Sequence, residues 1–147
     1  MHVWRLASGR YDPLSGEGAR VVGGRWNSPG HQVVYASESL ALCVVEALVH
    51  ITGTFPLDYC AFGIDVPDRA IERVDSIRLK QSWPQDLGLT RAIGDQWLQQ
   101  ARSLGLLVPS AVVPASVNVL VNPAHPPARS LRVVSREEFR FDPRLRS

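Results

Sequence analysis

The segment from Ser39 to Gly53 constrains the fold most, because its apolar side chains recur at helical spacing along two stripes. Ser37 or Ser39 can cap the start of this helix, and Gly53 ends it. The stripes consist of Leu40, Val44, Ala47, Leu48 and Ile51, and of Leu42, Val45 and Val49. We therefore expect other parts of the protein to cover this helix on most of its sides.

A single carboxylate, Glu46, interrupts this apolar helix. Burying an unpaired carboxylate is costly, so Glu46 must meet a cation, accept hydrogen bonds or open onto a pocket. Two plainer readings stay open at this point. Glu46 can form a structural ion pair with Arg25, or the helix can be exposed at Glu46.

Short strand-like segments surround the helix, and prolines and glycines interrupt them. Residues 8–19 are expected to form a loop, and residues 95–103 a second helix. Strands are expected at residues 1–6, 20–27, 31–36, 59–66, 71–74, 106–114, 117–122 and 132–134, the last at a sheet edge. Strands mixed with two or three helices predict an α+β fold with a mixed sheet, in a single domain over residues 1–147.

The motif GGRWNSPG, residues 23–30, ends in a Ser-Pro-Gly turn and predicts a hairpin between strands 20–27 and 31–36. In such a hairpin Arg25 lies opposite Val34 or Tyr35. Arg25 and Tyr35 can then share one site, with Glu46 on the helix that follows.

A second candidate, Ser110, stands between prolines in the apolar segment VPSAVVP. The plain alternative is a buried serine that is satisfied by a backbone partner. Asn118, Asn122 and His125 follow it, and Asn122 before Pro123 is an ordinary turn signal. The glycine motifs of nucleotide-binding loops and of serine hydrolases do not occur.

Composition excludes several classes of protein. Hydrophobic residues make up 45% and charged residues 20% of the chain, which argues against a disordered or fibrous protein. The net charge is only +2, so we expect no direct binding of nucleic acid. No apolar run is long enough to span a membrane and the start does not resemble a signal peptide, so we expect a cytoplasmic protein. Cys43 and Cys60 are expected to be reduced and structural, and no metal site is expected.

The ordered motifs GGRWNSPG, VVYASESLALCVVEALVH, GIDVP, PSAVVP and NVLVNPAHP resemble the RES-domain family, the toxin components of RES–Xre toxin–antitoxin pairs. The resemblance runs nearly from end to end of the chain. It implies a fold similar to ADP-ribosyltransferases and an enzyme that breaks the nicotinamide–ribose bond of NAD⁺, by hydrolysis, by phosphorolysis or by ADP-ribosyl transfer. A non-catalytic module that binds a nucleotide or ADP-ribose is the alternative.

The resemblance also implies the site residues and the partners. It places the catalytic set on Arg25, Tyr35, Glu46 and Ser110, and substrate-binding residues on Arg5, Arg25, Asn27, Tyr35 and Ser110. As a hypothesis, Glu46 stabilises the ribose cation, Arg25 binds phosphate oxygens and Tyr35 contacts the nicotinamide ring. NAD⁺ is expected as substrate with no further cofactor, and an Xre-type antitoxin as partner. Whether the chain forms homo-oligomers is left open.

Overall fold

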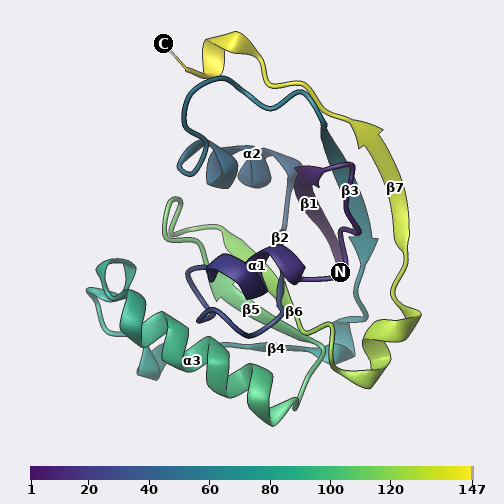
Figure 1. Cartoon of the computed structure of the whole chain (residues 1–147). Coiled ribbons are helices and arrows are strands. Elements are labelled where there is room, and N and C mark those ends of the chain that lie inside the picture. Colours follow the sequence, from purple (N-terminus) through teal and green to yellow (C-terminus); the bar gives the residue numbers. More distant parts are fainter. Residues whose placement is uncertain (147) are drawn as a thin grey trace.

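The computed structural model describes residues 1–146, and its seven strands form one mixed sheet (Figure 1). The sheet order is β4-β5-β6-β2-β1-β3-β7. Only β4 and β5 pair in parallel, and all other neighbours are antiparallel. The strands are β1 (His2–Ser8), β2 (Val34–Ser37), β3 (Tyr59–Asp65), β4 (Ile71–Arg73), β5 (Gly105–Pro109), β6 (Val117–Val121) and β7 (Val133–Glu138). This architecture confirms the predicted α+β class and the edge position of the last strand.

Three α-helices lie around the sheet: α1 (Glu17–Val22), α2 (Leu40–Leu48) and α3 (Leu87–Gln100). Helix α2 packs against β1 and β2, and α3 lies at the far end of the molecule beneath β5 (Figure 1). Ser39 caps α2 by accepting a hydrogen bond of 3.1 Å from the Leu42 N–H, so Ser39 and not Ser37 is the N-cap. Asp86 caps α3 in the same way.

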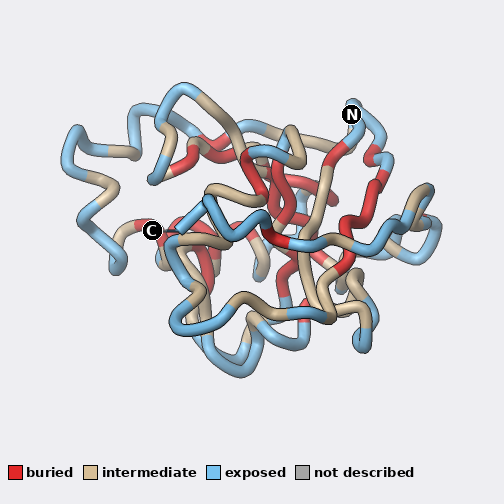
Figure 2. The backbone as a smooth tube through the Cα atoms, turned by 90° about the horizontal axis from the view of Figure 1, so that it is seen from above, coloured by how far each residue is buried: buried red, intermediate tan, exposed pale blue. Residues whose placement is uncertain are grey.

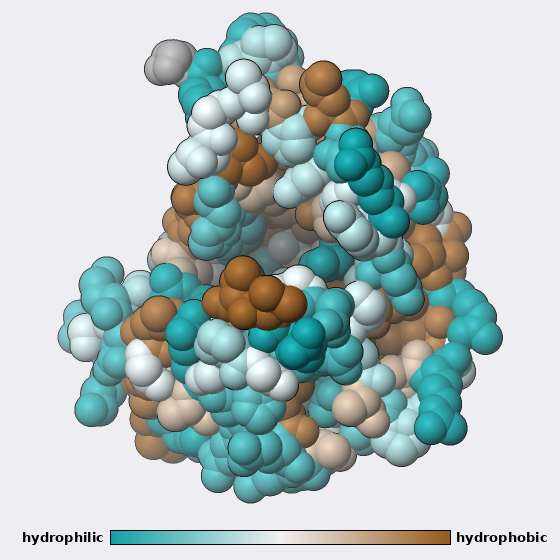
Figure 3. All heavy atoms as spheres, viewed as in Figure 1, coloured by the Kyte–Doolittle hydropathy of each residue, from teal (hydrophilic) through white to brown (hydrophobic). Residues whose placement is uncertain are grey.

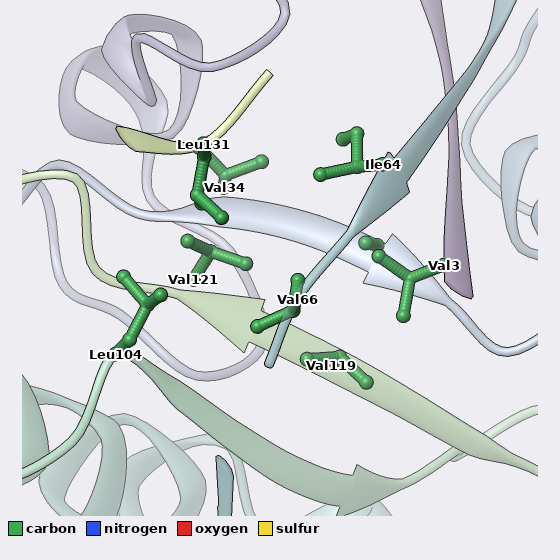
Figure 4. Close-up of a cluster of buried hydrophobic side chains, with 9 residues drawn as sticks. Val3, Val34, Ile64, Val66, Leu104, Val119, Val121 and Leu131 are labelled. Carbon is green, nitrogen blue, oxygen red and sulfur yellow. The ribbon is translucent and has the colours of Figure 1, made fainter. Parts of the chain in front are cut away.

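The sheet is buried on both faces, because successive residues of β6 enter two different clusters. Val119 and Val121 join the cluster of Figure 4, whereas Leu120 packs among Trp26, Trp97 and their neighbours. Burial of a side chain such as Leu120 stabilises the fold by about 1.5–3 kcal/mol. Figure 2 shows the buried segments gathered in the middle of the molecule. The central strands are thus rigid supports for polar residues at their ends.

The predicted hairpin of residues 20–36 is wrong. Residues 17–22 form α1, and β2 pairs with β1 and β6 instead of with the preceding segment. Gly16 and Gly23 have φ values of 68° and 75°, a conformation that favours glycine, and they bound this short helix. The chain from residue 23 to 30 then forms a loop with one isolated bridge, between Gly24 and Asn27.

Other predicted boundaries shift for local reasons. Helix α3 begins well before residue 95, because Asp86 supplies its cap. Strand β5 stops at Pro109, since the Ser110 N–H bonds to the Ser116 carbonyl and closes a loop. Cys43 and Cys60 are buried and free, as predicted. Within residues 1–146 no helix has the length and apolar character needed to cross a membrane.

Candidate functional site

Figure 3 shows a hollow in the face of the molecule between α2 and α1. Helix α1, beside the hollow in this view, has two exposed apolar residues, Val21 and Val22. The loop that joins β5 to β6 lies on the same side of the sheet as α2 (Figure 1). The polar groups described below come from the elements around this hollow.

Glu46 lies on α2, and one of its carboxylate oxygens is held by two donors. The Ser110 hydroxyl donates to Oε1 over 2.6 Å, and the Asn118 amide donates to the same oxygen over 2.8 Å. Within residues 1–146, Oε2 has no hydrogen-bond partner and is not buried. The arrangement fixes the carboxylate through one oxygen and leaves the other available to a ligand.

Ser110 follows β5 directly and is fully buried. Its hydroxyl oxygen accepts hydrogen bonds from the backbone N–H groups of Val112 and Val113, at 3.1 and 3.0 Å. These backbone donors orient the hydroxyl so that its hydrogen goes to Glu46. Ser110 is therefore satisfied by backbone partners, as the structural alternative expected, and it also donates to a carboxylate.

Asn118, on β6, is held in turn by Ser37 on β2. The Ser37 hydroxyl donates to the Asn118 carbonyl oxygen over 2.6 Å, and the two residues are paired across the adjacent strands. From the sequence, Asn118 was named after Ser110 without a role, and Ser37 was named only as a possible helix cap. The sequence does show a polar residue in each of these two apolar strands. It does not show that β2 pairs with β6, which is what brings the two residues together.

Arg25 lies in the loop after α1, and α3 holds the backbone of this loop. The Thr90 hydroxyl donates to the Arg25 carbonyl over 2.6 Å, and Arg91 Nε donates to the Gly24 carbonyl over 2.9 Å. Asp95 accepts from the Ser28 N–H over 2.9 Å. Sequence reasoning missed these anchors, because they come from a helix far along the chain.

The Arg25 guanidinium donates to the Pro84 carbonyl over 3.0 Å. No ion pair within residues 1–146 joins Arg25 to Glu46, so the reading of the two as a structural pair is wrong. The backbone at Arg25 is nevertheless near Tyr35, since the Tyr35 hydroxyl accepts a hydrogen bond of 2.9 Å from the N–H of Trp26, the next residue. The predicted neighbourhood of Arg25 and Tyr35 is thus present without the hairpin.

Tyr35 uses its hydroxyl inside the protein. The hydroxyl donates to Asn27 Oδ1 over 2.6 Å and accepts from the Trp26 N–H over 2.9 Å. Burial raises the pKa of Tyr35 well above its usual value of 10, and this outweighs the opposing effects of the Trp26 N–H and of nearby arginines. Asn27 is fully buried, and its amide donates to the carbonyls of Ala19, Ser28 and His31. Asn27 therefore organises the loop around Arg25.

Arg5, on β1, extends toward the same region. Its Nη1 donates to the Tyr35 carbonyl over 3.0 Å, and its buried Nε has no partner within residues 1–146. Burial lowers the pKa of Arg5 below its usual value, while the nearby Cys43 and Tyr59 act to raise it. A buried guanidinium with an unused donor is suited to an anionic or carbonyl oxygen of a ligand.

Two features lie outside this arrangement. No group of three or more His, Cys, Asp or Glu residues is placed to hold a metal ion in residues 1–146. A pocket of about 220 Å³ lies between β4, α3 and the start of β5, and its lining includes Arg73, Trp97 and Leu106. None of the predicted site residues lines this pocket. The chemistry of the site argues for the region around Glu46 instead, because three polar side chains converge there.

The RES domain family model matches residues 2–142. The chain belongs to the RES domain family. The family resemblance that the motifs indicated is thereby confirmed.

Relatives of this RES domain match over nearly their whole length. It is 37% identical over 152 residues to the Prs ADP-ribosylating toxin of Sphingobium sp. (strain YBL2), covering 97% of this chain and 94% of that protein. It is 38% identical over 152 residues to Toxin Res of Yersinia enterocolitica serotype O:8 / biotype 1B, covering 99% and 100%. Among solved structures, a chain of the M. tuberculosis MbcT–MbcA toxin–antitoxin complex matches with a TM-score of 0.77 and 26% identity, over 94% of this chain and 83% of that one.

Proposed function

We propose that this RES domain is an NAD⁺-consuming toxin that breaks the bond between nicotinamide and ribose. The observation that carries the proposal is the carboxylate of Glu46, fixed through Oε1 by Ser110 and Asn118 with Oε2 unengaged. The full-length similarity to a protein named Prs ADP-ribosylating toxin supports the same chemistry.

The reaction needs a carboxylate at this place. When the bond from ribose C1′ to the pyridinium nitrogen breaks, its electron pair goes to nicotinamide and positive charge develops on the ribose ring. A fixed carboxylate oxygen stabilises that charge and can bind the ribose 2′-hydroxyl. An acceptor oxygen then bonds to C1′ and loses its proton. Glu46 Oε2 supplies the carboxylate oxygen in this proposal.

The other predicted residues divide into ligand contacts and supports. Arg25 and Arg5 each use one guanidinium nitrogen in a bond to a backbone carbonyl, which leaves further donors for the phosphate or ribose oxygens of NAD⁺. The Tyr35 hydroxyl is engaged internally, so its ring is the part that contacts nicotinamide. Asn27 supports Tyr35 and the Arg25 loop through its internal hydrogen bonds.

The test follows free nicotinamide when the purified protein is incubated with NAD⁺. Glu46→Gln keeps the shape of the side chain and removes its charge, and we expect it to lose at least 100-fold in rate, about 3 kcal/mol of transition-state stabilisation. Glu38→Gln is the matched control, because Glu38 lies just before α2 and only accepts an exposed backbone hydrogen bond. Nicotinamide release by unaltered protein at no more than the uncatalysed rate, together with tight binding of ADP-ribose, would support the non-catalytic alternative instead.

The acceptor of the ADP-ribose group is identified by the mass of the product. The Sphingobium relative's name favours transfer to an acceptor molecule, while water and phosphate are the competing acceptors. Reactions in water alone, with added phosphate and with cell extract distinguish ADP-ribose, ADP-ribose phosphate and a labelled macromolecule. We place this activity in the cytoplasm, because buried cysteines that stay free fit a reducing compartment.

We also propose an antitoxin partner of the Xre type. The support is the similarity to a chain from a toxin–antitoxin complex and the exposed valines of α1 beside the hollow. Co-expression with a candidate Xre-type protein, followed by size-exclusion chromatography, tests it. A complex that releases no nicotinamide is expected, and separate elution of the two proteins with full activity contradicts the proposal.

A further inference from the structure

We propose that Asn118 is a positioning residue for Glu46 and that Ser37 fixes the orientation of Asn118. The inference rests on the proposed function, since it concerns the carboxylate that acts in that reaction. It adds two residues, from β2 and β6, that the resemblance to the family did not supply.

The direction of every hydrogen bond in this chain of contacts follows from the carboxylate. An ionised carboxylate only accepts, so the Asn118 group that faces Glu46 Oε1 at 2.8 Å must be the NH₂ end of the amide. The carbonyl end of Asn118 then faces Ser37, and the Ser37 hydroxyl must donate to it, over 2.6 Å. Ser37 thus selects the one amide orientation that is useful to Glu46.

The supports of this contact are rigid. Ser37 and Asn118 occupy paired positions on adjacent antiparallel strands, and Ser37 is buried. Asn118 also pairs with Val108 of β5, the strand that leads to Ser110. Both donors to Glu46 are therefore fixed by the centre of the sheet, whereas Glu46 itself is on a separate helix.

Two donors on one carboxylate oxygen limit rotation of the group about its terminal bond. With Ser110 alone, the carboxylate can pivot about that single contact, and Oε2 moves relative to the ribose. A displacement of about 1 Å in a catalytic group lowers the rate by about 100-fold. Asn118 acts in this way through Glu46 and needs no contact with NAD⁺.

The experiment measures kcat and KM for nicotinamide release in Asn118→Ala, Ser37→Ala and the double variant. We expect kcat to fall roughly 10- to 100-fold in Asn118→Ala, with KM for NAD⁺ changed less than about threefold. Ser37→Ala should give a smaller fall in kcat. The double variant should be no slower than Asn118→Ala, because Ser37 acts through Asn118.

Two further variants separate this role from a general loss of stability. Ser8→Ala removes a hydroxyl-to-carboxylate bond of the same 2.6 Å length, to Asp58, from another strand end and should leave kcat unchanged. Asn118→Asp keeps the size of the side chain and its bond from Ser37 but removes the donor to Glu46, so it should lose at least as much kcat as Asn118→Ala. Thermal unfolding of each variant shows whether it is folded.

Three results overturn the inference. They are a kcat within twofold of unaltered protein in folded Asn118→Asp, a rise in KM without a fall in kcat, and additive losses from Ser37→Ala and Asn118→Ala. An unaltered protein that releases no nicotinamide would instead contradict the proposed function itself. The two failures are thus distinguished by the unaltered protein alone.

Discussion

The Thr90 hydroxyl, on α3, donates a 2.6 Å hydrogen bond to the backbone carbonyl of Arg25, 65 residues earlier in the chain. Thr90 is fully buried, so its hydroxyl bonds to the protein and not to water. The contact makes α3 the support of the loop that carries Arg25.

Thr90→Val should lower the free energy of unfolding by about 1–3 kcal/mol, because the Arg25 carbonyl loses its donor while the shape of the side chain is kept. KM for NAD⁺ should rise, since Arg25 is less well placed. Urea denaturation and steady-state kinetics measure the two effects. Thr90→Ser keeps the hydroxyl and serves as control, and a KM equally raised in both variants would contradict the explanation.

Gly94→Ala should destabilise the protein by at least about 3 kcal/mol. A Cβ atom at Gly94 would lie 1.7 Å from the carbonyl oxygen of Trp26, so α3 and the Arg25 loop could not keep their contact. Gly88, in the first turn of the same helix, offers a matched control, because its added Cβ would meet nothing closer than 3.6 Å. Gly88→Ala should be neutral or stabilise by up to about 1 kcal/mol, and thermal unfolding compares the pair.

Tyr35→Phe separates the hydroxyl of Tyr35 from its ring. The variant should lose about 1–3 kcal/mol of stability, since buried Asn27 loses a donor and the Trp26 N–H loses an acceptor. Burial raises the pKa of Tyr35, so the hydroxyl stays protonated as a donor at neutral pH. Nicotinamide release per folded molecule should fall less than in Glu46→Gln. An equal fall in both variants would assign the hydroxyl itself to the reaction.

Glu17, at the start of α1, should make the free energy of unfolding of the protein depend on pH. Hydrogen bonds from Arg20 and then Gln32 lower the pKa of Glu17 from 4.5 to about 2. A lowered pKa in the folded state adds stability that is present above about pH 4.5 and is lost as the pH falls toward 2. Glu17→Gln should therefore be less stable than unaltered protein at pH 7 and equal to it near pH 2, as urea denaturation at both pH values would show. A difference that does not change with pH would contradict this.

The sequence predicted the local elements better than the contacts between them. Helix α2, its cap and the interruption at Glu46 follow from the spacing of apolar residues and from Ser39. Helix α1 was missed, because two adjacent valines favour a strand and a helix of one to two turns leaves little periodicity. Pro29 and Gly30 do form a turn, but the turn leads from a loop to β2 and does not connect two paired strands.

The site was predicted as a set of residues, and its geometry was not. The motifs of the family indicated Glu46 and Ser110, yet their contact spans 64 positions and depends on where β5 ends. Asn118 and Ser37 could not be placed, because strand pairing between β2 and β6 joins segments about 80 residues apart. Long-range pairing of this kind is determined by the whole sheet and not by any local pattern.

The order in which the chain is synthesised bears on when this site can exist. Glu46 precedes its donors Ser110 and Asn118 by 64 and 72 residues. At about 5–20 residues per second, a ribosome takes roughly 4–14 s to reach Asn118 after Glu46. During that interval the nascent chain carries a carboxylate that nothing yet positions. The hydrogen bonds that fix Glu46 can therefore form only late in translation, after β6 has been synthesised.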